Sequence, residues 1–255
     1  MEKIEAQVCD MGNRMASIVN LSFAAVGVRL LADGSEYPNG AERLEHHRYC
    51  QALMKARGGM NVTLDGVGIS CPAAASAFGF RPLPPPLQSG KGLVGFGIVS
   101  KAEVGQKMFL EMPRLDPGEI QRIHLFPLNR AEYLPDVVVV EDEVEKLMWI
   151  VLSYLHAMDG DRVESTTAVL QATCVDATVI PYKQDRLNFS YGCYGCRDAT
   201  DIGGHETVLG FPGFMLPAIV EHLEFLKNKA IPTSRSKKAL ASLRRDEYRQ
   251  DGKVC

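Results

Sequence analysis

The segment Asp136-Val-Val-Val-Val140-Glu-Asp-Glu143 decides the fold class of this 255-residue chain. Its four consecutive valines predict a compact strand, because β-branched side chains pack well on a pleated surface. The acidic run 141–143 indicates the start of a helix that continues to about Met158, since carboxylates are favourable at the positive end of a helix. A strand that passes directly into a helix is typical of a fold that mixes the two.

The rest of the chain alternates in the same way. We expect further strands and helices from the spacing of apolar residues and from turn signals. The strands are expected at 23–31, 61–69, 120–126, 186–191 and 207–211, and the helices at 3–20, 41–57, 71–78, 101–111, 166–179 and 212–229. Hairpin and crossover connections are not distinguishable, so the pattern predicts an α/β or α+β fold with one mixed β-sheet packed with helices.

The domain organisation follows from length and composition. We expect one globular domain over residues 1–229, with an internal boundary possible near 82–97. There the run Pro82-Leu-Pro-Pro-Pro86 predicts extended backbone before a glycine-rich loop. Residues 227–255 hold nine Lys or Arg against three acids. Residues 230–255 are therefore expected to form a helical basic C-terminal tail, laid on an acidic face of the body or of a second copy.

Charge and hydropathy exclude several classes of partner. The net charge of −3 gives no reason to expect a nucleic-acid partner. No run approaches the ~18–20 apolar residues of a membrane span, and the charged first residues lack the apolar core of a secretory signal. These features predict a cytoplasmic protein with reduced thiols and no membrane or nucleic-acid partner. The charge asymmetry of the tail is compatible with a homo-oligomer.

The cysteines are the strongest functional signal. The run Tyr191-Gly-Cys-Tyr-Gly-Cys-Arg197 contains a Cys-x-x-Cys pair, and the glycine before each cysteine permits the tight turn that such a pair needs. Cys50, Cys71 and Cys174 lie in segments that are expected to be ordered. Cys71 precedes a proline and is expected to cap a short helix, where backbone amides favour the thiolate.

Several interpretations of these cysteines stay open. Thiolates of Cys50, Cys71, Cys193 and Cys196, with Cys174 as a replacement, would suit an iron–sulfur cluster, of the four-iron four-sulfur type. Zinc is the alternative metal, although a structural zinc site ordinarily uses two close cysteine pairs and this chain has one. The pair could instead be a thioredoxin-like dithiol, or the single cysteines could simply fill core positions.

Other motifs give weaker signals. Residues 90–95 match G-x-G-x-x-G, but a proline run rather than a strand precedes them, so we expect a flexible glycine loop or lid rather than a dinucleotide site. His205 and Glu206 follow two glycines and are candidate catalytic residues. Arg48 and Arg197 each lie near a cysteine and could pair with a substrate carboxylate or a thiolate, or form surface salt bridges.

Several segments taken in order are similar to an uncharacterised family of archaeal conserved region proteins, domain of unknown function 169. The similar segments are 26–31, 48–50, 56–59, Cys71, 135–140, 146–148, 171–174, 192–197, Glu206 and 210–212, within about residues 20–220. The resemblance implies that Cys50, Cys71, Cys174 and Cys196 are shared by the family. It also implies an origin in archaea or anaerobic bacteria, which suits oxygen-sensitive thiolate chemistry, and it implies no particular activity.

Together these observations predict a cytosolic iron–sulfur protein, either a redox enzyme or an electron carrier, with an unidentified substrate and redox partner. The alternative is a small-molecule-binding protein or non-redox enzyme in which the cysteines are structural. In that alternative the glycine loop and the His205–Glu206 turn would frame the pocket.

Overall fold

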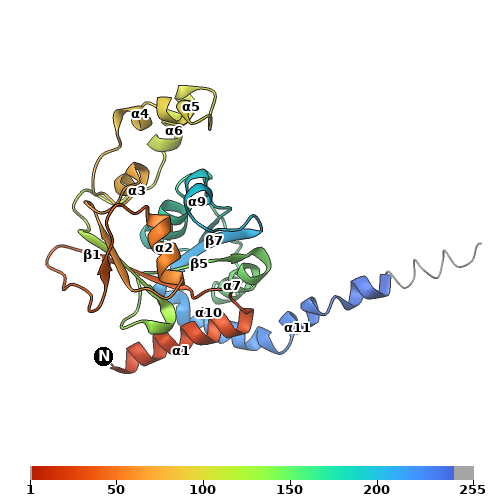
Figure 1. Cartoon of the computed structure of the whole chain (residues 1–255). Helices are drawn as coiled ribbons and strands as arrows, with labels where there is room; N and C mark the ends of the chain where they lie inside the picture. The colour runs from red at the N-terminus through yellow and green to blue at the C-terminus, as the bar shows by residue number, and fades with distance from the viewer. Residues whose placement is uncertain (1, 244–255) are drawn as a thin grey trace, which may run out of the picture.

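The computed structural model describes residues 2–243 (Figure 1). A seven-stranded mixed sheet of order β2-β3-β4-β1-β5-β7-β6 runs through this part of the chain; β2 and β3 pair in parallel and the other neighbours are antiparallel. The strands are β1 (Val26–Leu31), β2 (Glu42–Arg43), β3 (Val62–Asp65), β4 (Arg122–Pro127), β5 (Val137–Glu143), β6 (Asn188–Ser190) and β7 (Glu206–Pro212). The sheet and its helices form an α/β fold, as predicted.

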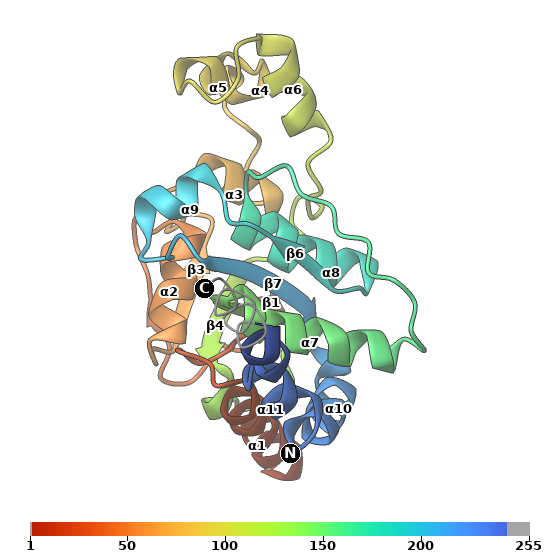
Figure 2. The same cartoon turned by 90° about the vertical axis from the view of Figure 1, so that its right-hand side faces the viewer.

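Helices cover both faces of the sheet (Figure 2). One face carries α2 (Tyr49–Arg57), α3 (Pro72–Ala77), a π-helix (Ala172–Val179) and α8 (Ile180–Gln184). The other face carries α1 (Glu2–Val19), α7 (Val144–Ala157), α10 (Leu216–Lys227) and α11 (Ala230–Arg235). Alternate valines of β5 enter the two separate cores, since neighbouring side chains of a strand point to opposite faces. The valine run is thus buried on both faces.

The acidic run after the valines belongs to the strand and not to the helix. β5 continues to Glu143, so the predicted helix start at 141 is wrong by three residues. Asp142 is fully buried, where its carboxylate accepts hydrogen bonds from the backbone amide of Ser22 at 2.6 Å and from Lys146 Nζ at 2.8 Å. These bonds compensate for its burial and fasten the segment before β1 to the start of α7.

Two predicted helices are shorter than expected. The helix predicted over 41–57 begins only at Tyr49, because the preceding backbone pairs with β3 and its following turn. Leu44 donates its amide to Thr63 at 2.8 Å and His47 to Gly68 at 3.1 Å. The helix predicted over 166–179 begins at Ala172 and is a π-helix, a rare form that is frequent at functional sites.

Residues 85–110 form a helical unit that stands away from the sheet above α3 (Figures 1 and 2). It consists of α4 (Pro85–Gln88), α5 (Lys91–Gly95) and α6 (Ala102–Leu110), and we call it the cap. The expected extended proline run ends at Pro84, because proline is tolerated in the first turn of a helix. The expected flexible glycine loop is wrong, since these residues are helical and packed.

The tail contacts the body through α11, on the face of the sheet that carries α7, and its residues 232–243 are exposed. Arg235, the last residue of α11, binds the carboxylate of Glu145 on α7 through Nε at 3.0 Å and Nη2 at 3.1 Å. The tail is helical as predicted where the structure describes it, whereas its residues 244–255 lie outside the described residues. The domain limits at 229 and near 82–97 stay a prediction.

Candidate functional site

The Cys-x-x-Cys pair lies at the start of α9 (Tyr194–Ala199), between β6 and β7. Gly192 has a positive φ of 85°, which turns the chain from β6 into the helix. Cys193 is the N-cap, and its Sγ accepts the amide of Cys196 at 3.3 Å, while the amide of Cys193 donates to Cys196 Sγ at 3.2 Å. The two Sγ atoms are 2.9 Å apart. Each thiol is therefore held both by the backbone and by the other thiol.

The surroundings shift the pKa values of the two thiols in opposite directions. The hydrogen bond from Cys196 and the backbone amides of Ala172, Cys196 and Gly195 lower the pKa of Cys193, although burial acts against them. The same side-chain hydrogen bond, together with burial, raises the pKa of Cys196. The surroundings of Cys193 therefore favour the thiolate form more than those of Cys196 do.

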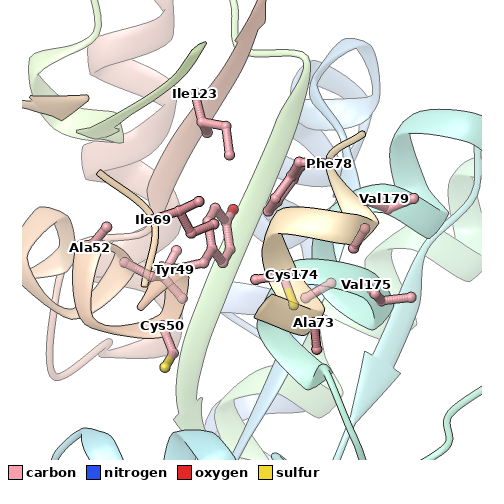
Figure 3. Packing of buried hydrophobic residues seen from close by; sticks show 14 of the residues in the cluster. Tyr49, Cys50, Ala52, Ile69, Ala73, Phe78, Ile123, Cys174, Val175 and Val179 are labelled. Atoms are coloured by element: carbon pink, nitrogen blue, oxygen red, sulfur yellow. The ribbon is translucent and has the colours of Figure 1, made fainter. Parts of the chain in front are cut away.

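The other three predicted cysteines come from three different elements. Cys50 lies in the first turn of α2, Cys71 is the N-cap of α3 as predicted, and Cys174 lies in the π-helix. Figure 3 shows Cys50 and Cys174 in one cluster of buried side chains, together with Tyr49 and Ala73. The fold therefore brings these segments, which are distant in sequence, to one region above the sheet.

All five cysteines line a single cavity of about 660 Å³, which we call the cysteine cavity. Burial, together with repulsion from the nearby sulfurs of Cys193 and Cys71, raises the pKa of Cys50 to about 12. Burial likewise raises the pKa of Cys174, with added repulsion from Cys71, Cys193 and Cys50. Several thiolates in this cavity would repel one another unless a cation neutralises them.

The π-helix reaches the cavity because of two local features. Gly210 of β7 has no side chain, and an added Cβ there would lie 1.8 Å from the carbonyl oxygen of Ala177, so the helix packs directly on the strand. Thr178 Oγ1 donates to the carbonyl of Thr173 at 2.8 Å and contacts the Tyr49 hydroxyl at 2.8 Å. These contacts fix the helix against α2 and set the position of Cys174.

Arg48 is at the cavity, as its position beside Cys50 suggested. Its Nη1 donates to the carbonyl of Gly195 at 3.0 Å and lies 3.3 Å from Asp198 Oδ2. Gln51 adds a hydrogen bond from Nε2 to the carbonyl of Ala199 at 3.2 Å. The N-terminal turn of α2 is thus fastened to α9, which keeps Cys50 near the pair.

The other candidate residues lie outside the cavity lining. Arg197 donates to the carbonyls of Tyr191, Gly203 and Glu206, so its guanidinium joins the segments on either side of α9. Glu206 accepts the amide of Gly203 at 2.6 Å, and His205 is exposed. Arg197 and Glu206 thus hold the local backbone, and none of the three residues lines the cavity.

Two parts of this region were predicted incompletely or not at all. The first is the cap: the sequence predicted the helix over 101–111 and, in the alternative interpretation, the glycine loop at the pocket, but not the helices α4 and α5. The cap lines the cavity through Leu87 of α4, Leu93 of α5, Phe96 directly after α5, and Phe109 of α6. The apolar spacing of these residues was the available signal. The second part is the buried pair of Arg57 and Glu141, whose Nε and Oε2 atoms are 3.3 Å apart and whose side chains are 2% and 1% exposed.

The five cysteines are spread more widely than the ligands of a single metal ion. Among residues 2–243, no three His, Cys, Asp or Glu side chains are grouped closely enough to hold one metal ion. In the same part of the chain, no helix is long and apolar enough to cross a membrane.

Comparison with curated proteins and with solved structures gave no match. A family model described as "uncharacterised ArCR" matches residues 14–222, which include all five cavity cysteines and the cap. The chain therefore belongs to the family of domain of unknown function 169.

Proposed function

We propose that this protein is an iron–sulfur protein whose four-iron four-sulfur cluster is held by four of Cys50, Cys71, Cys174, Cys193 and Cys196. The observation that carries the proposal is their convergence: five cysteines from four elements line one cavity. Free cysteines often fill core positions singly, whereas these five line one shared space. Soft thiolate ligands suit iron–sulfur clusters and zinc.

The spread of the cysteines favours a cluster over zinc. The thiolates that hold a four-iron cluster bind different iron atoms, whereas all ligands of a structural zinc share one ion. A cluster therefore accommodates a wider set of cysteines, in keeping with the lack of any three closely grouped ligands among residues 2–243. Cluster binding would also replace the contact between Cys193 and Cys196 with bonds to iron.

The surroundings suit a redox role in the cytoplasm. The five cavity cysteines are all free thiols, the form that a reducing compartment maintains. Backbone amides donate to the sulfur of Cys193, and such bonds together with burial tune the reduction potential of a cluster. We therefore propose a cytoplasmic redox enzyme or electron carrier that exchanges electrons with a separate redox partner.

Single Cys→Ser substitutions test the ligand assignment. After anaerobic purification, four of the five cavity variants should lose most of their iron and sulfide, and the fifth should keep them. Cys9→Ser is the matched control, because Cys9 lies on α1 and packs against the core on the other face of the sheet. Iron retained in all five cavity variants would contradict the proposal.

The pair geometry favours a second candidate, a dithiol that cycles with a disulfide. Its support is the 2.9 Å contact and the lowered pKa of Cys193 at a helix N-cap, the arrangement that activates a thiol. A redox titration followed by mass spectrometry would then show reversible loss of two hydrogens from the peptide that contains 193 and 196. The cluster proposal predicts instead that Cys50→Ser or Cys71→Ser changes the redox behaviour of the protein.

A further inference from the structure

We propose that the cap side of the cysteine cavity is a binding site for a small, uncharged, largely apolar molecule, the substrate of the proposed redox centre. That the bound molecule is a substrate rests on the proposed function, whereas the binding site itself depends only on the cap and the cavity. It concerns the wall opposite the cysteines.

The chemistry of this wall is apolar. The cavity-lining residues contributed by the cap and its flanking segments, excluding Gly92, are Pro84, Pro86, Leu87, Leu93, Phe96, Ile98 and Phe109. Aromatic and branched side chains that line a concave site bind apolar molecules by removing both surfaces from water. Ser70, Gln171 and Thr173 also line the cavity and can hydrogen-bond a hydroxyl or carbonyl of the bound molecule.

The size of the cavity leaves room for a ligand. Its volume is about 660 Å³, within the range of roughly 300–1,000 Å³ that small-molecule sites occupy. The cysteines lie on one wall and the cap forms the other, so a molecule between them would contact both. A packing defect would not be expected to have this size or two chemically distinct walls.

The charges of the lining select an uncharged molecule. Arg48 and Asp198 are the charged side chains among the lining residues, and they pair with each other at 3.3 Å. A charged ligand would lose its hydration without gaining a free counter-charge from these side chains.

The cap is built as a fixed wall. Gly90 has a positive φ of 74°, and an added Cβ there would lie 2.0 Å from the carbonyl of Ala102, so α5 packs directly against α6. Phe96 lines the cavity yet is 61% exposed, which places a large aromatic side chain where the cavity opens to solvent. A ligand bound in the cavity would cover part of this ring and remove apolar surface from water.

The test compares 2-naphthol, a neutral aromatic probe, with its anionic analogue 2-naphthoate by calorimetry on the anaerobically purified protein. We expect 2-naphthol to bind and 2-naphthoate to bind at least about tenfold more weakly. Phe96→Ser should weaken 2-naphthol binding about tenfold, since it removes one apolar wall. Val94→Ser is the matched control, because Val94 belongs to α5, is 39% exposed and does not line the cavity.

Leu87→Ser, on α4, is a second variant that should also weaken binding of 2-naphthol. Absence of 2-naphthol binding, equal binding of 2-naphthoate, or binding unaffected by both cavity variants would overturn the inference. Iron is measured on the same samples, so the two proposals can fail separately. Selective binding of 2-naphthol without iron would contradict only the cluster proposal. Iron without binding of 2-naphthol would contradict only the binding site.

Discussion

Arg48 Nη1 donates a hydrogen bond to the carbonyl oxygen of Gly195, 3.0 Å away and 147 residues along the chain. This bond joins the turn that contains Cys50 to the turn that contains Cys193 and Cys196. Because the bond fixes the backbone of both turns, it helps to set the distance between Cys50 and the Cys193–Cys196 pair.

Replacing Arg48 with alanine should loosen this junction. The carbonyl of Gly195 loses a charged donor and Asp198 loses its partner, so we expect unfolding to be easier by about 1–2 kcal/mol and iron content to fall. Denaturant unfolding and an iron assay measure the two effects. Arg43→Ala is the control, because Arg43 forms an exposed pair with Asp65 and makes no contact with α9, so its replacement should have a smaller effect on both measurements. Equal effects of the two substitutions would show that the junction has no special role.

Gly210→Ala should be among the most damaging single substitutions. The new Cβ would lie 1.8 Å from the carbonyl oxygen of Ala177, so β7 and the π-helix would have to separate. We expect a loss of at least about 3 kcal/mol or no folded protein, measured by thermal unfolding. Gly204→Ala, where an added Cβ meets no atom within 4 Å, should be tolerated. A well-folded Gly210→Ala protein would contradict the close packing described here.

Glu141 should make stability depend on pH. Burial raises the pKa of Glu141 from its ordinary 4.5 to about 7, although Arg57 acts in the opposite direction. The folded protein therefore retains a proton that the unfolded chain releases, so this contribution is present below pH 4.5 and is lost as pH rises towards 7. The loss is on the order of 2–3 kcal/mol.

Urea unfolding of the wild type and Glu141→Gln at several pH values measures this contribution. As pH rises from 5 to 7, the unfolding free energy of the wild type should fall relative to that of Glu141→Gln, which has no carboxyl proton to lose at this position. Asp176, whose pKa burial also raises to about 7, will leave a residual slope of the same sign in both proteins. Parallel curves would show that Glu141 holds no proton in the folded state.

The sheet could be predicted from the sequence because its strands depend on local patterns. The valine run before Glu141 is β-branched and uninterrupted, β1 is mostly apolar, and apolar residues alternate with charged or polar ones at the start of β4. β2 is different, because it has two exposed residues and exists through pairing with β3. That pairing also explains the late start of α2, since long-range hydrogen bonds outweighed helical spacing.

The candidate site could be predicted only in part. The five cysteines are visible in the sequence, but their approach to one cavity depends on the close contact at Gly210 and on the bonds of Arg48, which no spacing rule reveals. The helix over 101–111 was predicted and is α6, whereas α4 and α5 were not predicted, because glycine and proline ordinarily indicate loops. Here Gly90 serves close packing between α5 and α6.

The most direct test of the central claim is the amount of iron, acid-labile sulfide and zinc per chain in the anaerobically purified wild-type protein. We expect about four iron and four sulfide per chain, with visible absorbance that bleaches on reduction. Stoichiometric zinc without iron, or a metal-free protein whose cysteines remain thiols, would contradict it.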